Sequence, residues 1–166
     1  MASSKYDLRI RFLEVKNQHM NTWKIELNDI SFGNDTNLEE VFGKPKFQSH
    51  VTNGPLNIVT SENVDVDGYS FNIKIFFVNK RIDKMQLIPV NLGMKDPGYP
   101  DKEYQEEKKK VSDSFLRKHF GEPLKENEAV LYYEFDWGSA SSVAFLSGRN
   151  EYAGGFIEIV YKKTGE

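Results

Sequence analysis

Hydrophobic and polar residues alternate along most of this chain, and a two-residue period is typical of half-buried β-strands. Near the N-terminus the alternation predicts strands at residues 6–15 and 23–27, joined as a hairpin by a polar connector. Residues 30–32 continue the pattern, and we expect them to extend the second strand after a bulge at Asp29. The chain is therefore predicted to begin with an antiparallel strand pair.

The strongest alternation lies in the middle of the chain. Residues 46–68 are polar and turn-rich, with one short strand expected at 56–60. Residues 69–78 then form a strand, and Asn79-Lys80 suits a two-residue turn because Asn tolerates a positive φ. The returning strand and three strands near the C-terminus are expected at 81–90, 130–137, 141–146 and 156–162.

A helical period replaces the alternation in two segments. Residues 101–120 are predicted to form one long helix, with residues 106–110 facing water. A short helix begins at Thr36, which together with Glu39 matches a capping box. The apolar stripe expected on the long helix consists of Tyr104, Val111, Phe115, Leu116 and Phe120.

Both predicted helices end in the same pattern, Phe-Gly-x-Pro. Gly43 and Gly121 lie 78 positions apart in a chain of 166 residues, and each can adopt the positive φ that ends a helix. Pro45 and Pro123 follow two residues later and hold the exit extended, so these four residues are the predicted helix stops. Because strands follow each stop, we predict an α+β fold with antiparallel sheets, one long and one short helix, and two related helix-plus-meander halves.

The boundary between these halves is expected at residues 91–100, which contain two glycines and two prolines and suit a linker. Residues 1–90 then hold the strand hairpin, the short helix and an antiparallel meander. Residues 101–166 hold the long helix and a three-strand meander. The alternative is one continuous domain.

Part of this pattern resembles a known architecture. Ile30-Ser31-Phe32-Gly33 and Leu38-Glu39-Glu40-Val41-Phe42-Gly43-Lys44-Pro45, followed by the apolar strand residues 71–77, are similar to repeats of the β-lactamase inhibitor protein-like architecture. That architecture includes small outer-membrane lipoproteins of the SmpA/BamE type. The chain departs from it because it lacks a lipoprotein Cys and has one short first helix where such repeats usually have two. The resemblance implies a protein that binds another protein, without catalysis.

Composition narrows the class of protein. The net charge is −3, whereas a non-specific nucleic-acid binder is usually basic, so nucleic acid is not the expected partner. The absence of Cys excludes disulfides and thiolate chemistry. No apolar run has the length of a membrane span, and residues 1–5 have no signal-peptide character. The chain as written is expected to be soluble and cytoplasmic, or else an envelope or secreted protein from which a signal peptide was removed.

The sequence contains no recognisable catalytic or metal-binding set. His19, His50 and His119 have no second His or carboxylate at ligand spacing, so neither a metal nor a cofactor is predicted. Gly-rich phosphate loops and nucleophile elbows are also missing. An alternative function is a small hydrolase-type enzyme that uses the sheet-face carboxylates of Glu134 and Asp136. A minor alternative is RNA binding by a basic sheet face made of Arg9, Arg11, Lys24, Lys74 and Lys84.

Two predicted hairpin loops, at residues 136–141 and 147–155, contain residue types that are frequent at protein interfaces. Trp137 is expected in the core, with partner contact as the alternative. The loop that carries Arg149 and Tyr152 is expected either to bind or merely to be flexible. We therefore predict a non-catalytic protein-binding module of the inhibitor, immunity or envelope-assembly type. Its candidate binding residues are Trp137, Ser139, Ser141, Arg149, Asn150 and Tyr152.

Overall fold

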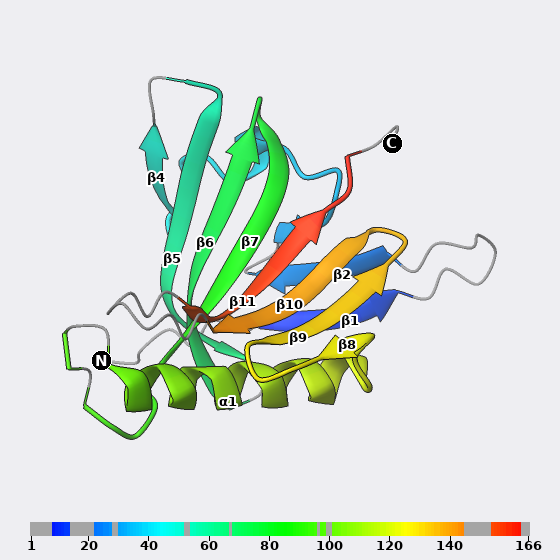
Figure 1. Cartoon of the computed structure of the whole chain (residues 1–166). Helices are drawn as coiled ribbons and strands as arrows, with labels where there is room; N and C mark the ends of the chain where they lie inside the picture. Colours follow the sequence, from blue (N-terminus) through cyan, green and yellow to red (C-terminus); the bar gives the residue numbers. More distant parts are fainter. Residues whose placement is uncertain are drawn as a thin grey trace.

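The described part of the protein contains two antiparallel sheets and one long helix, as predicted for an α+β fold (Figure 1). The computed structural model of the chain describes residues 8–13, 22–27, 30–51, 54–66, 68–95, 97–98, 101–144 and 154–163. In Figure 1 the helix lies across one end of the larger sheet, and the smaller sheet lies behind the larger sheet.

The smaller sheet has three strands, β1 (Leu8–Leu13), β2 (Thr22–Leu27) and β3 (Ile30–Phe32). The predicted hairpin of β1 and β2 is confirmed, since Leu8 pairs with Leu27 in an antiparallel register. The expectation that residues 30–32 extend the second strand is wrong, because β3 pairs antiparallel with β2. The predicted bulge at Asp29 lies outside the described residues.

The predicted short helix is a single 3₁₀ turn, η1 (Leu38–Glu40). Its N-cap is Asn37, not Thr36: the Asn37 side chain accepts from the Glu39 N–H at 3.1 Å, and the Glu40 carboxylate accepts from the Asn37 N–H at 2.7 Å. The Thr36 hydroxyl cannot cap because it accepts from the Gly33 N–H at 2.8 Å. The capping box therefore lies one residue later than predicted.

The larger sheet has eight antiparallel strands in the order β4-β5-β6-β7-β11-β10-β9-β8. Strands from the middle and from the C-terminal part of the chain meet at its centre, where β7 pairs with β11. The strands are β4 (Gln48–Val51), β5 (Leu56–Val66), β6 (Tyr69–Val78), β7 (Arg81–Val90), β8 (Lys125–Glu126), β9 (Val130–Phe135), β10 (Gly138–Ala144) and β11 (Gly154–Tyr161).

Several strand boundaries differ from prediction. The edge strands β4 and β8 were not expected, because they are short and polar. Strand β5 continues six residues beyond its predicted end through a bulge at Asn63, which has φ of 53°. The Asn63 N–H donates to the side-chain oxygen of Asn72 at 3.0 Å, so the bulge breaks the alternation without leaving this donor unpaired.

The long helix α1 (Lys102–Phe120) agrees with the prediction, and the Asp101 side chain caps its first turn by accepting from the Tyr104 N–H at 3.0 Å. One residue of its predicted water-facing segment, Lys109, is instead buried. Its ammonium group lies 2.6 Å from a carboxylate oxygen of Asp113, one turn along the helix. This neighbouring carboxylate compensates for the desolvation of the buried charge.

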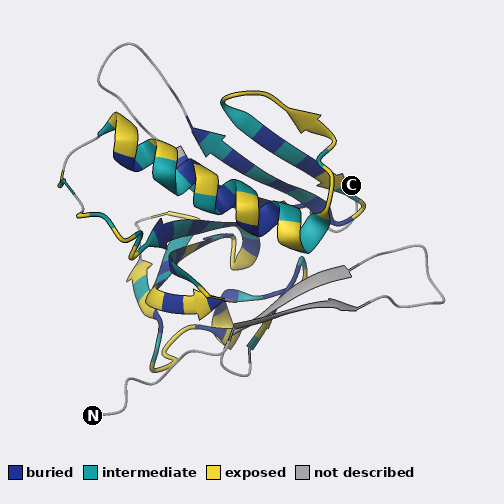
Figure 2. Cartoon of the chain, turned by 90° about the horizontal axis from the view of Figure 1, so that it is seen from below, coloured by how far each residue is buried: buried dark blue, intermediate teal, exposed yellow. Residues whose placement is uncertain are grey.

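The core lies between the larger sheet and the elements on one of its faces. Phe115 and Leu116 of α1 and Phe32 of β3 are fully buried against that sheet. Figure 2 shows the helix with its buried residues turned toward the strands and its exposed residues turned away. Helix and sheet approach closely at Gly155, where an added Cβ would lie 2.7 Å from the Lys108 Cβ, so the site favours Gly.

The second helix stop is held by tertiary contacts. Gly121 has φ of 75°, as expected, and its N–H donates to the Arg117 carbonyl at 2.9 Å. Its own carbonyl accepts from the Tyr133 hydroxyl at 2.7 Å. Burial raises the pKa of Tyr133, an effect that Arg117 opposes. Arg117 also binds Glu126 of β8, so the last turn of α1 is attached to two strands.

Candidate functional site

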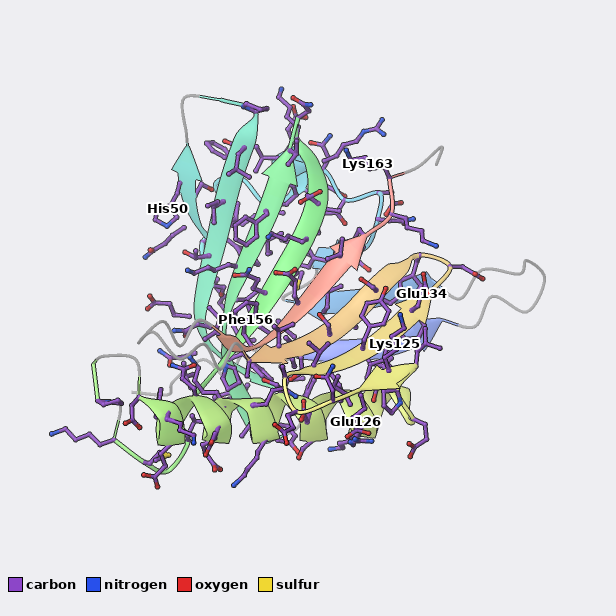
Figure 3. The ribbon with its side chains drawn as sticks, viewed as in Figure 1. His50, Lys125, Glu126, Glu134, Phe156 and Lys163 are labelled. Atoms are coloured by element: carbon purple, nitrogen blue, oxygen red, sulfur yellow. The ribbon has the colours of Figure 1, made fainter. Side chains whose placement is uncertain are left out.

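The side chains of the larger sheet point alternately to two faces that have different surroundings. On β6 the buried face carries Phe71, Ile73, Ile75 and Phe77, all at most 1% exposed. The residues between them point the other way and are partly or fully exposed. No described helix or strand lies in front of this second face in Figures 1 and 3. We call it the open face: Ile58, Thr60, Asn72, Lys74, Phe76, Lys84, Gln86, Ile88, Val130, Tyr132, Glu134, Ser139, Ser141, Val143, Phe156, Glu158 and Val160.

A polar row crosses the open face at the level of Glu158. The Glu158 carboxylate accepts from the Gln86 side-chain N–H at 3.0 Å and lies 3.7 Å from the Lys84 ammonium group. Lys84 in turn lies 4.9 Å from the ring centroid of Phe76, within the range of a cation–π contact. The centre of the open face therefore carries charged groups that neighbouring strands hold in place. The pairing register makes a row of Thr60, Lys74, Gln86, Glu158, Ser141 and Tyr132.

An apolar row lies beside the polar one. Phe156 pairs with Val143, and Val143 pairs with Val130, so three apolar side chains follow one another across β11, β10 and β9. All three are partly exposed. Figure 3 shows Phe156 at the lower end of the larger sheet, above α1, and Glu134 toward its β8 side. Apolar and polar groups thus lie side by side on the open face, and protein interfaces also combine apolar area with hydrogen-bonding groups.

The structure separates the predicted binding residues. Ser139 and Ser141 lie on the open face of β10 and are partly exposed. Trp137 lies in the turn between β9 and β10, where it is 4% exposed and its ring stacks on Phe135 with centroids 4.9 Å apart. This placement agrees with the expectation of a core residue. Arg149, Asn150 and Tyr152 lie outside the described residues.

The same turn changes the predicted position of the carboxylates. Strand β9 ends at Phe135, so Asp136 lies in the turn rather than beside Glu134 on one strand face. Both side chains are exposed, and Glu134 pairs in register with Ser139. Gly138, the first residue of β10, lies very close to β11. An added Cβ at this position would lie 2.0 Å from the Val160 carbonyl oxygen.

The predicted basic face is divided between two sheets. Arg11 and Lys24 pair with each other in the three-stranded sheet, which also contains Arg9. Only Lys74 and Lys84 belong to the larger sheet. The five basic residues therefore do not share one sheet face, and the expectation that they do is wrong.

The sequence did not identify the aromatic and charged residues at the centre of the open face. Phe76, Phe156 and Glu158 belong to strands that were predicted, and the alternation places them opposite the buried residues. The signal was therefore present, as an aromatic residue on the side of a strand that faces away from the core. Which face stays open depends on where α1 and β3 pack, and alternation in a single strand does not specify this.

In the described part of the chain, the His, Asp and Glu residues form no group of three or more that could hold a metal ion. None of its helices combines the length and apolarity needed to cross a bilayer. No family model, curated protein or solved structure matches the chain.

Proposed function

We propose that this protein is a non-catalytic protein-binding module, of the inhibitor, immunity or envelope-assembly type, and that the open face is its contact surface. The observation that carries this proposal is that apolar side chains and polar side chains fixed by their neighbours lie together across six neighbouring strands. No described helix or strand covers this face. Apolar side chains such as Phe76 and Phe156 offer area to desolvate, and Glu158 with its neighbours offers specific polar contacts.

We further propose that the two halves of the chain are related repeats. In the first half η1, Gly43 and four strands follow in order, and in the second half α1, Gly121 and four strands do so. The two four-stranded meanders meet through their last strands, β7 and β11, so the sheet order is symmetric about its centre. The symmetric strand order supports the proposed repeat, which is what the resemblance to β-lactamase inhibitor protein-like and SmpA/BamE-like repeats implies, and such a repeat would build one continuous face from two copies of a unit.

The proposal is tested by affinity capture with charge-changing variants. Lys74→Glu and Ser141→Arg alter the open face at two exposed or partly exposed positions. Ser114→Arg and Lys118→Glu make the same chemical changes on the exposed side of α1 and serve as matched controls. Each tagged variant is incubated with lysate of the source cells, and the captured proteins are quantified by mass spectrometry.

We expect at least one specifically captured protein to be lost with both open-face variants and retained with both helix variants. Circular dichroism melts of all four proteins establish that folding is intact, because exposed substitutions usually change stability little. A capture profile that is unchanged by the open-face variants, or that is lost with the helix variants, would contradict the proposed surface.

The loop between β10 and β11 is a second part of this proposal. In sequence it connects the end of β10, next to Val143, to the start of β11, near Phe156. The double variant Arg149→Ala/Tyr152→Ala should leave the melting temperature nearly unchanged and weaken capture of the same protein. Unfolding of the variant would show that these side chains are structural, and normal capture would restrict the contact surface to the open face.

A further inference from the structure

We draw no further inference here: the strongest candidate, the open face of the eight-stranded sheet around Lys84 and Glu158, belongs to the site already described, its acidic and basic side chains are interspersed, and nothing in the structure shows what covers it.

Discussion

The two Phe-Gly-x-Pro segments have the same backbone feature and different surroundings. Gly43 and Gly121 both have φ of 75°, and an added Cβ at either position would meet no atom within 4 Å. Yet Phe42 is 55% exposed, whereas the Phe120 ring lies 4.9 Å from that of Phe135 and 5.5 Å from that of Tyr133. The motif therefore determines where the chain turns, and it does not determine what its Phe contacts.

The element before each motif accounts for the difference. The 19-residue helix α1 buries an apolar side against the larger sheet and carries Phe120 onto β9. The three-residue turn η1 buries Leu38, and the following Val41 is also buried, so Phe42 is left to point outward. The same local signal thus contributes to the core in one half and to the surface in the other.

Truncating the packed Phe should have the largest effect. Phe120→Ala removes a partly buried ring from its contacts with Tyr133 and Phe135, and we expect a loss of about 2 kcal/mol in the free energy of unfolding. Urea denaturation followed by circular dichroism measures this loss. A midpoint equal to that of the wild type would mean that the aromatic cluster contributes nothing.

The next largest effect is expected for a substitution of the glycine in the second Phe-Gly-x-Pro motif. Gly121→Val forces a β-branched residue into a conformation with positive φ, and we expect a cost of about 1 to 2 kcal/mol from backbone strain alone. Gly54→Val is the control, because Gly54 is exposed and has no positive φ. Thermal melts of both variants test the assignment, and equal melting temperatures would contradict it.

The hydrogen bond to the second stop should contribute less. Tyr133→Phe removes the donor to the Gly121 carbonyl, and we expect a loss of about 1 kcal/mol. Tyr161→Phe is the matched change, because the Tyr161 hydroxyl is buried and has no hydrogen-bond partner among the described residues. Removing that hydroxyl should leave stability unchanged or raise it. Equal losses in the two variants would show that the contact at Gly121 is not specific.

The surroundings of Tyr133 and Tyr161 also predict how stability responds to alkaline pH. Burial raises the pKa values of Tyr133 and Tyr161 above the ordinary value of 10.0, because both folded environments disfavour the phenolate. The contribution of the two neutral phenols to the free energy of unfolding is therefore complete below their unfolded-state pKa. It is lost as the pH rises from that pKa toward their higher folded-state pKa values. Urea midpoints measured between neutral and strongly alkaline pH should fall less steeply for Tyr133→Phe/Tyr161→Phe than for the wild type.

The smallest effect is expected at the first motif. Phe42→Ala removes a mostly exposed ring, and the free energy of unfolding should change by less than about 0.5 kcal/mol. The denaturation protocol used for Phe120→Ala provides a direct comparison. A loss as large as that of Phe120→Ala would mean that the two motifs are packed alike.

The sequence predicted those parts of the fold that depend on neighbouring residues. Strands β6 and β7 and helix α1 were located to within one residue, because their periodic patterns are regular and extend over many residues. The position of the cap at η1 was missed because adjacent Thr and Asn side chains can both cap, and only the Gly33 contact decides between them.

The candidate site was predicted less completely. Ser139 and Ser141 were predicted as residues of a hairpin loop, but this expectation was wrong, because both lie in strand β10. Glu158, Gln86 and Lys84 come together only because β7 pairs with β11, and residues 91–153 separate these two strands along the chain. Such a pairing depends on long-range register, which single-strand patterns do not encode.

The central place of β11 also has a consequence during synthesis. Strand β11 comes after all the other described strands in sequence, yet it lies between β7 and β10 in the sheet. A nascent chain that has not yet released β11 from the ribosome leaves both neighbours with unpaired edges, and such edges promote association with other chains. Completion of the sheet must therefore wait until β11 has been synthesised, and termination before residue 154 should yield an aggregation-prone product rather than a smaller folded one.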